Sequence, residues 1–206
     1  MTTPLYMKKG RHLLTHHDGK ERVWDPTTSK LAAALFNGLV HFRLERTSAV
    51  LYLGASTGTT VSHLSDMIGD GNDGDRGGII YAIEFSERVF RSLVSLAAER
   101  TNIAPLLMDA RLPERYAWIE QCDLLVADVA QPDQTDIAVR NATMFLKPAG
   151  TLLLSVKSQS IDVTKAPQVV YEEERQKLEA AGFRVLQTVD LEPFEQKHAL
   201  IAARKS

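Results

Sequence analysis

The chain has 206 residues, of which 44% are hydrophobic and 24% charged, with a formal net charge of −2. These values are typical of a single globular domain with a core, and they exclude a disordered chain or one built of membrane-spanning helices. The single Cys122 excludes an internal disulfide or a cysteine-based zinc site and favours a reducing compartment, cytosolic or nuclear.

The first part of the chain is basic. Residues 1–46 contain eight Lys or Arg and four Asp or Glu, a net charge of +4, so the remainder carries −6. Short mixed segments and the turn sequence His17-Asp-Gly-Lys predict a small β-hairpin region over residues 1–25, ahead of a main domain over 26–206. His16, His17 and Asp18 have no further ligands at a useful spacing, so no metal site is expected.

The next segment is predicted to be a helix. Asp25-Pro-Thr-Thr-Ser is typical of a helix start, and apolar residues then recur at helical spacing. These residues are Leu31, Leu35, Phe36, Leu39, Val40 and Phe42. Lys30 lies close to the helix start, where the helix dipole disfavours a cation, so its position calls for an explanation.

Beyond this helix, apolar strands alternate with helical patterns. Strands are predicted at 49–53, 79–83, 103–108, 123–127, 151–156, 183–189 and 198–203, the last two as an antiparallel pair. Helices are predicted at 60–69, 86–100, 134–146 and 168–181, with a loose glycine-rich loop at 69–78 and Lys147-Pro-Ala-Gly closing the third helix. This alternation predicts a doubly wound, mostly parallel α/β sheet of seven strands.

Candidate ligand-binding residues follow the strand ends, which share one edge of a parallel sheet. Gly54-Ala-Ser-Thr-Gly-Thr-Thr follows the first of these strands, and its glycines let the backbone approach a ligand at a helix N-terminus. After the next strand, Glu84 is placed to accept both hydroxyls of a ribose and Phe85 to pack on adenine. Asp109 follows the third strand, where it can accept from the adenine amine. Together these positions predict a nucleoside cofactor.

The form of the glycine loop narrows the choice of cofactor. It is neither the Gly-x-Gly-x-x-Gly of dinucleotide sites nor the Gly-x-x-x-x-Gly-Lys-Ser/Thr of P-loops. A short glycine loop with an acid after the second strand suits S-adenosylmethionine, which has no phosphate.

One competing motif is a hydrolase nucleophile elbow. Gly54-Ala-Ser-Thr-Gly matches Gly-x-Ser-x-Gly, and Ser56, Asp128 and His198 occur in hydrolase order. An elbow belongs in mid-sheet, however, whereas this loop follows the first strand of the sheet and no oxyanion-hole loop precedes it. The hydrolase interpretation also gives Glu84 and Asp109 no role, so it is the weaker one.

Several long runs closely resemble the fibrillarin family, over nearly the whole chain from about residue 20. They are Ser29-Lys-Leu-Ala-Ala-Ala, Val50-Leu-Tyr-Leu-Gly-Ala-Ser-Thr-Gly-Thr-Thr-Val-Ser-His, Tyr81-Ala-Ile-Glu-Phe-Ser, Asp128-Val-Ala-Gln-Pro, Val156-Lys-Ser-Gln-Ser-Ile-Asp-Val-Thr-Lys and Leu191-Glu-Pro-Phe-Glu-Gln-Lys-His-Ala-Leu. The sequence shows no glycine–arginine-rich N-terminal tail, so it looks like the archaeal form.

The resemblance implies a Rossmann-like S-adenosylmethionine-dependent methyltransferase domain over 26–206. The activity implied is RNA 2′-O-methylation of rRNA, and of tRNA as a further substrate, within a box C/D guide ribonucleoprotein. Its implied partners are guide and target RNA, a Nop-type scaffold protein and a kink-turn-binding protein, with no membrane. Its implied location is cytoplasmic for an archaeal chain and nucleolar for a eukaryotic one. A non-catalytic assembly module is the alternative of a different class, and the intact catalytic set argues against it.

The site residues divide into two sets. The family's catalytic set falls on Lys30, Asp128, Lys157 and His198. The cofactor set is Gly54, Ala55, Ser56, Gly58, Thr59, Thr60, Glu84, Phe85, Asp109, Ala110, Asp128, Val129, Ala130 and Gln131, with no metal ligand. We expect Lys157, flanked by Lys30, to stabilise the alkoxide that develops on the ribose or to take its proton, and the identity of the base stays open. Candidates for phosphate contact are Lys8, Lys9, Arg11, Lys20 and Arg22.

Overall fold

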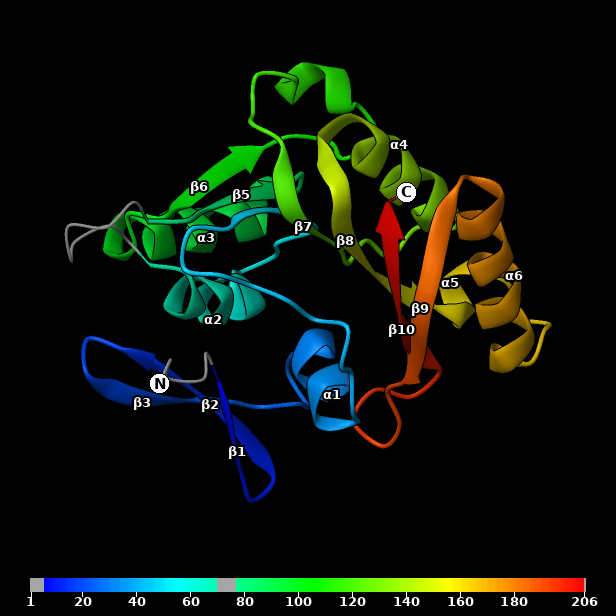
Figure 1. Ribbon diagram of the computed structural model, residues 1–206, viewed down its shortest axis with the longest axis horizontal. Helices are drawn as coiled ribbons and strands as arrows, with labels where there is room; N and C mark the ends of the chain where they lie inside the picture. The colour runs from blue at the N-terminus through cyan, green and yellow to red at the C-terminus, as the bar shows by residue number, and fades with distance from the viewer. Residues whose placement is uncertain (1–5, 70–76, 206) are drawn as a thin grey trace.

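A computed structural model describes residues 6–69 and 77–205, and its centre is a seven-stranded sheet (Figure 1). The strands are β4 Ala49–Leu53, β5 Ile79–Glu84, β6 Ile103–Leu107, β7 Cys122–Ala127, β8 Leu146–Lys157, β9 Phe183–Asp190 and β10 His198–Lys205. They are ordered β6-β5-β4-β7-β8-β10-β9, and β10 is antiparallel to both neighbours while β6, β5, β4, β7 and β8 pair in parallel. The expected mostly parallel sheet with a final antiparallel pair is confirmed.

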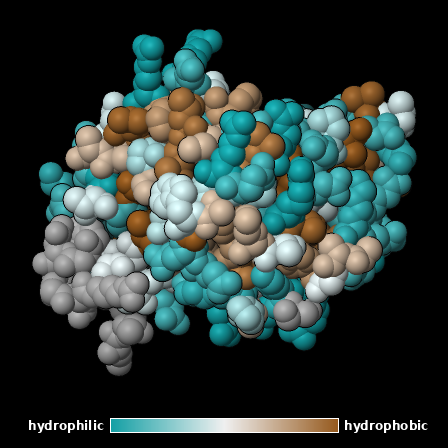
Figure 2. Space-filling view, turned by 90° about the horizontal axis from the view of Figure 1, so that it is seen from above, coloured by the Kyte–Doolittle hydropathy of each residue, from teal (hydrophilic) through white to brown (hydrophobic). Residues whose placement is uncertain are grey.

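Helices cover both faces of this sheet. They are α1 Lys30–Phe36, α2 Thr59–Met67, α3 Glu87–Glu99, α4 Gln134–Phe145, α5 Ser158–Ile161 and α6 Pro167–Ala180, with a 3₁₀ turn η1 at Pro113–Tyr116. Side chains alternate across a strand, so Val50 and Tyr52 join the core under α1, α2 and α3, whereas Leu51 and Leu53 join the core under α4 and α6. Among the described residues, no helix is long and apolar enough to cross a membrane. Hydrophilic residues cover much of the face in Figure 2, with apolar residues in small groups between them.

The N-terminal segment forms three antiparallel strands, where the sequence predicted a hairpin. They are β1 Met7–Lys9, β2 His12–His17 and β3 Lys20–Trp24. Asp18 and Gly19 both have positive φ, 50° and 72°, which is the geometry of the tight turn that the Asp-Gly sequence indicates. Leu13 and Trp24 are fully buried in the same core as α2, so this small sheet packs firmly against the main one.

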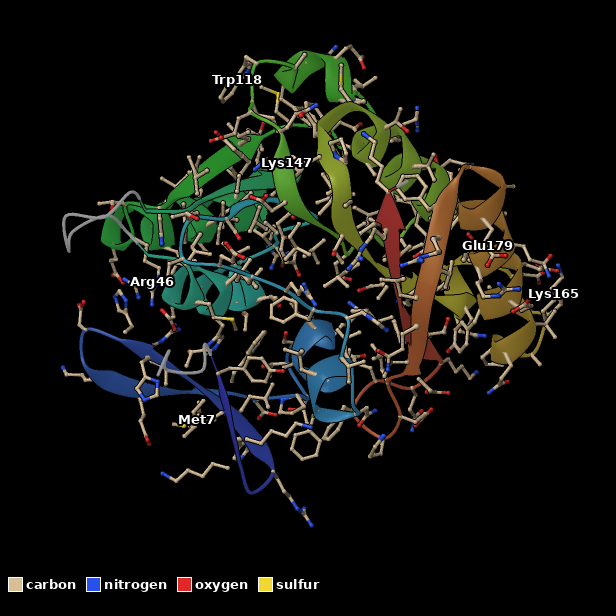
Figure 3. The ribbon with its side chains drawn as sticks, in the orientation of Figure 1. Met7, Arg46, Trp118, Lys147, Lys165 and Glu179 are labelled. Atoms are coloured by element: carbon tan, nitrogen blue, oxygen red, sulfur yellow. The ribbon has the colours of Figure 1, made fainter. Side chains whose placement is uncertain are left out.

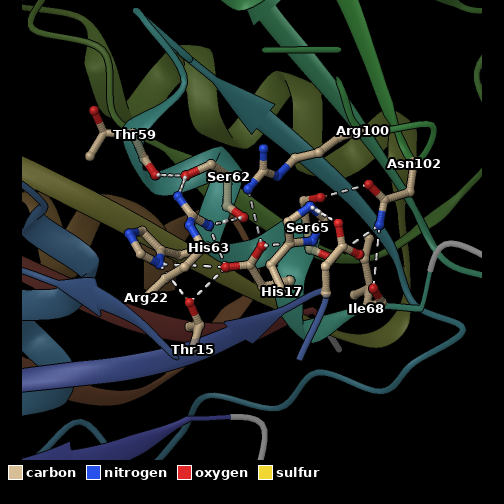
Figure 4. A network of polar contacts seen from close by, with 12 residues as sticks. Thr15, His17, Arg22, Thr59, Ser62, His63, Ser65, Ile68, Arg100 and Asn102 are labelled. Atoms are coloured by element: carbon tan, nitrogen blue, oxygen red, sulfur yellow. Dashed lines mark hydrogen bonds and ion pairs between the residues drawn. The ribbon is translucent and has the colours of Figure 1, made fainter. Parts of the chain in front are cut away.

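Polar contacts join Thr15 and Arg22 of the small sheet to a buried carboxylate on α2 (Figure 4). The side chain of Asp66 is fully buried and is paired with Arg22 of β3 and, at 3.4 Å, with Arg100 after α3. The Thr15 hydroxyl of β2 donates to the same carboxylate at 2.7 Å. Since this hydroxyl has one proton, the Nδ1 of His63, 2.8 Å away, must donate to it.

The first helix is much shorter than the pattern predicts. Ser29 is its N-cap and accepts from the Ala32 amide at 3.3 Å, whereas Asp25 instead closes a turn onto Thr27 at 2.8 Å. Gly38, with φ 98°, follows the end of the helix. The apolar periodicity beyond Phe36 therefore belongs to a loop, in which Leu39 is buried and Val40 is 73% exposed.

The end of α4 also differs from the prediction. The helix stops at Phe145 and β8 begins at once, so the segment 147–150 does not close the helix but lies within the strand. The pairing with β7 jumps from Cys122↔Leu146 to Leu124↔Thr151, which makes this segment a bulge. Most of the expected glycine-rich loop, residues 70–76, lies outside the described residues.

We predict that Asp66→Ala lowers the free energy of unfolding by about 3–5 kcal/mol, because it leaves two guanidinium groups without their buried partner. Urea unfolding followed by circular dichroism measures the change. Glu173→Ala is the matched control, since it removes a carboxylate whose ion pair with Lys165 is exposed, and little change is expected. Equal midpoints for the two variants would contradict the role given to Asp66.

We predict that His63 makes stability depend on pH. Burial, and then the charges of Arg22 and Arg100, lower the pKa of His63 from 6.5 to about 3. The unfolded chain therefore binds this proton first, and stability falls as pH falls from about 6.5 toward 3, by up to about 1.4 kcal/mol per pH unit. Urea unfolding between pH 4.5 and 7 should give a shallower slope for His63→Phe than for wild type or the exposed control His12→Gln. Parallel slopes for all three proteins are the contrary outcome.

Candidate active site

The turn between β4 and α2 is fixed by two glycines. Gly54 has φ 80°, and a Cβ there would lie 2.5 Å from the backbone oxygen of Asp128. Gly58 has φ 90° and is the N-cap of α2, and a Cβ there would lie 2.4 Å from Leu96. Only glycine meets both demands, so the backbone of this turn packs directly against the end of β7 and against α3.

The carboxylate of Glu84 holds the backbone of this turn through a hydrogen bond. Glu84 is the last residue of β5, is 6% exposed, and accepts from the Ser56 amide with one carboxylate oxygen and from the Ser86 amide with the other, each at 2.8 Å. Ser86 occupies the N-cap position of α3 without a side-chain capping bond, so the backbone bond to Glu84 supports that helix start. Each oxygen keeps a further lone pair for a ligand hydroxyl.

A cavity of about 300 Å³ opens at this edge of the sheet. Ten predicted cofactor residues line it: Gly54, Ser56, Glu84, Phe85, Asp109, Ala110, Asp128, Val129, Ala130 and Gln131. Ala55, Gly58, Thr59 and Thr60 are not in the lining. Four lining residues were missed by the sequence analysis, namely Ile83, Met108, Arg111 and Ile137. Phe85 is 65% exposed, so its ring is available to stack on a planar ligand group such as an adenine.

Asp109 has a partner that the sequence did not reveal. Arg111 donates to both of its carboxylate oxygens, at distances from 2.6 to 3.1 Å. Side-chain hydrogen bonds from Arg111 lower the pKa of Asp109, which keeps this carboxylate ionised as an acceptor. Arg111 is half exposed, so it is able to turn outward when a ligand amine takes its place. Its only sequence signal is its position two residues after a strand-end acid.

The position of Lys30 at a helix start is explained by an ion pair at this edge of the sheet. Lys30 is the first residue of α1, and its Nζ lies 2.8 Å from Oδ1 of Asp128, which follows β7. The Asp128 amide in turn donates to the carbonyl of Leu53, at 2.9 Å. The anion offsets the unfavourable position of a cation at a helix N-terminus, and it brings two residues 98 positions apart into one site.

Thr60, in the first turn of α2, contacts the residue that caps α1. Its hydroxyl is 2.9 Å from that of Ser29, the N-cap of α1, and it also bonds the hydroxyl of Tyr52. Burial, and then the charge of Asp128, raise the pKa of Tyr52, so its phenol stays neutral. Thr60 therefore ties the starts of α1 and α2 together, and its contacts in the structure are with these side chains.

Lys157 and His198 form a second pair at the same edge. They lie directly opposite each other where β8 and β10 end and begin. The Nδ1 of His198 is 2.7 Å from the carbonyl oxygen of Gln196. Because a carbonyl only accepts, Nδ1 carries a hydrogen, and in the neutral ring Nε2 holds the lone pair. Asp128 follows Ala127, which pairs with Leu154 of β8, so both pairs stand at adjoining strand ends.

The hydrolase arrangement is not formed. In the described part of the chain, no hydrogen bond joins Ser56, Asp128 and His198. Asp128 instead pairs with Lys30, and the nitrogen of His198 that an acid would orient donates to Gln196. Nor do residues 6–69 and 77–205 hold a group of three or more His, Cys, Asp or Glu suited to a metal ion.

The cavity fits an adenosine-bearing cofactor. Its lining combines an apolar floor of Ile83, Met108 and Ile137 with carboxylates at two successive strand ends and an exposed ring at the rim. A Cβ at Gly54 would lie 2.5 Å from the backbone oxygen of Asp128, another lining residue, so glycine at this position lets the turn approach the opposite wall.

Comparisons with known proteins agree with this geometry. The family model described as Fibrillarin matches residues 5–206. A fibrillarin-like rRNA/tRNA 2′-O-methyltransferase of Methanopyrus kandleri is 46% identical over 192 residues, which cover 92% of this chain and 80% of that protein. The fibrillarin of a fibrillarin/Nop5p complex superposes with a TM-score of 0.88 at 37% identity, covering 98% of both chains.

A third relative bears on the fold. The structure of Aeropyrum pernix fibrillarin with natively bound S-adenosyl-L-methionine superposes with a TM-score of 0.80 at 44% identity, covering 93% of this chain and 82% of that one. The expected methyltransferase fold is thus confirmed. Since the family model matches nearly all of the sequence and each of these relatives exceeds 30% identity over most of it, the chain belongs to the fibrillarin family.

Proposed function

We propose that this chain is an S-adenosylmethionine-dependent RNA 2′-O-methyltransferase that modifies rRNA, and tRNA as a further substrate, at nucleotides chosen by a guide RNA. The observation that carries the proposal is the Lys30–Asp128 ion pair beside the cofactor-sized cavity, with Lys157 and His198 at the adjoining strand ends. The 2′-O-methyltransferase name of the relatives supports the reaction and the substrate class.

The cofactor would lie across the carboxyl edge of the sheet. Glu84 would accept the two ribose hydroxyls, Phe85 would pack on adenine, and Asp109 would accept from its amine. The N-terminus of α2, which follows the glycine turn, would attract the methionine carboxylate. Bound there, S-adenosylmethionine would supply an activated methyl group for transfer to the ribose 2′-oxygen.

The chain's own contribution is positioning and electrostatics. The Nζ of Lys157 would donate to the ribose 2′-oxygen and stabilise the negative charge that develops there. Lys30, held by Asp128, adds positive potential without occupying that position. His198, directly opposite Lys157 in the strand register, would offer its Nε2 lone pair as an acceptor for the proton that leaves the hydroxyl.

We further propose that the chain works inside a box C/D ribonucleoprotein. The described part of the chain consists of the methyltransferase fold and one small antiparallel sheet, so sequence selection would come from pairing between guide and target RNA. The relative that was solved with Nop5p supports a Nop-type scaffold as partner. A kink-turn-binding protein is proposed from the family resemblance.

We predict that Lys157→Ala lowers methyl transfer by about 10²–10³-fold, which is the usual cost of removing one transition-state donor. Methyl mapping at the nucleotide paired to the guide, in a complex reconstituted with labelled cofactor, measures the rate. Cofactor affinity should stay at the wild-type value, and the exposed-lysine control Lys165→Ala should be fully active.

A second substitution separates the two roles of Lys157. Lys157→Arg keeps the positive charge but cannot take a proton at ordinary pH, so substantial activity in this variant would assign Lys157 to charge stabilisation. Near wild-type methylation by Lys157→Ala would contradict the role proposed for Lys157, whatever the result for the arginine variant.

We predict that Glu84→Gln weakens S-adenosylmethionine binding by about 10–100-fold, because the amide loses charged acceptors for the ribose hydroxyls and for two backbone amides. Isothermal titration calorimetry measures the affinity, with Glu87→Gln on the exposed first turn of α3 as the matched control. A melting curve shows whether the variant remains folded. An unchanged affinity in a folded Glu84→Gln protein would remove Glu84 from the cofactor site.

A further inference from the structure

A second concave region lies at the opposite edge of the main sheet. Two cavities of about 420 and 300 Å³ adjoin there and share Arg43, Thr151 and Arg204 in their lining. The first is also lined by the β8 bulge 147–150, and the second by His41 and Arg184. We call the two together the amino-edge groove. Figure 3 shows Lys147 beside the upper ends of β7 and β8, at the far end of the sheet from α1.

The sheet itself crowds two of these cations. Arg204 of β10 and Arg184 of β9 are direct partners across the antiparallel pair, and both line the groove. Side chains that are directly opposite lie only about 5 Å apart at Cβ, and like charges in such a pair are destabilising. A groove built on paired arginines therefore gains stability when an anion enters it.

No carboxylate of the described residues pairs with the three arginines of this groove. Within residues 6–69 and 77–205, the side chains of Arg43, Arg184 and Arg204 have no hydrogen bond or ion pair, and the Nε of Arg204 is buried without any acceptor. Two acids line the groove, Glu45 and Asp123. Asp123 is already held by Lys147 at 2.8 Å and by the Ala49 amide at 2.9 Å. A buried guanidinium nitrogen without an acceptor, as at Arg204, calls for a partner from outside the chain.

The groove is separate from the methyl-transfer site. Arg204 pairs with Thr151 of β8, and His198 pairs with Lys157 six residues further along the same two strands. At about 3.3 Å per residue, the two positions are roughly 20 Å apart. A ligand in the amino-edge groove therefore cannot be the ribose that is methylated.

We propose that the amino-edge groove binds phosphate groups of an RNA segment other than the methylated one. The planar guanidinium matches phosphate oxygens bidentately, and Thr151 adds a hydroxyl donor to the lining. The choice of RNA rests on the proposed function, which brings this polyanion to the protein in every reaction. Because the chain carries a net charge of −2, phosphates are attracted only where cations gather, as they do here.

The test uses the full chain with Arg43→Gln and Arg184→Gln combined, since both side chains are exposed and their loss should not unfold the protein. Binding to a labelled guide–target RNA is measured by fluorescence anisotropy across a series of salt concentrations. The plot of log affinity against log salt should become shallower by about 1.4–1.8, the loss of two phosphate contacts. Methylation at saturating RNA should stay at the wild-type rate.

Two matched variants sharpen the result. Arg91→Gln with Arg140→Gln changes the net charge equally at exposed positions of α3 and α4, and should keep the wild-type slope. Arg43→Lys with Arg184→Lys keeps the charge and should restore most of the slope. A Gln variant with the wild-type slope overturns the proposal. So does one that binds RNA normally but no longer binds the Nop-type scaffold in a pull-down, since the groove is then a protein interface.

This experiment also separates the two proposals. The binding measurement needs no cofactor and no methyl transfer. If the wild-type complex methylates nothing while the slope still falls in the Gln variant, the proposed function fails and the RNA-binding groove stands. If the wild-type complex methylates its target and the Gln variant keeps the wild-type slope, only the proposal of an RNA-binding groove is contradicted.

Discussion

The ion pair between Lys30 and Asp128 is the contact on which the arrangement of the catalytic residues depends. It joins the first turn of α1 to the end of β7, and the anion offsets the unfavourable field of the helix N-terminus on Lys30. The other end of α1 is fixed as well, because the side-chain Nδ2 of Asn37 donates to the carbonyls of Asp190 and Glu192, each at 2.8 Å. The helix is thus held at both ends across the strands that carry Lys157 and His198.

The cofactor cavity depends on backbone geometry more than on side-chain packing. Glu84 uses both carboxylate oxygens to hold the amides of Ser56 and Ser86, so one buried anion shapes the walls on two sides. Gly54 allows the turn to meet the end of β7 at a distance that no Cβ permits. These restraints prepare the cavity before a ligand arrives, which lowers the cost of ordering it on binding.

The two edges of the sheet carry different chemistry. The carboxyl edge presents carboxylates at successive strand ends, with two lysines beside them, and the amino edge presents arginines. The parallel strands make this division possible, because each delivers its following residue to one edge and its preceding residue to the other. The antiparallel β10 runs the opposite way, so its last residues, Arg204 among them, reach the amino edge. The β8 bulge adds to it by opening a hollow where a regular strand would have filled the space.

The sequence by itself determined the order of strands and helices and the acids at the strand ends, because hydrophobic periodicity and the residues after each strand are local signals. It also indicated that Lys30 needed an explanation. Only the tertiary structure decided where α1 ends, that 147–150 forms a bulge, that Arg111 binds Asp109, and that Arg184 faces Arg204. The end of α1, the bulge and the arginine pair depend on contacts between distant segments or on the exact pairing register, and a local pattern carries no information about either. The Arg111–Asp109 pair is local in sequence, but it depends on the conformation of the loop after β6, which no periodicity predicts.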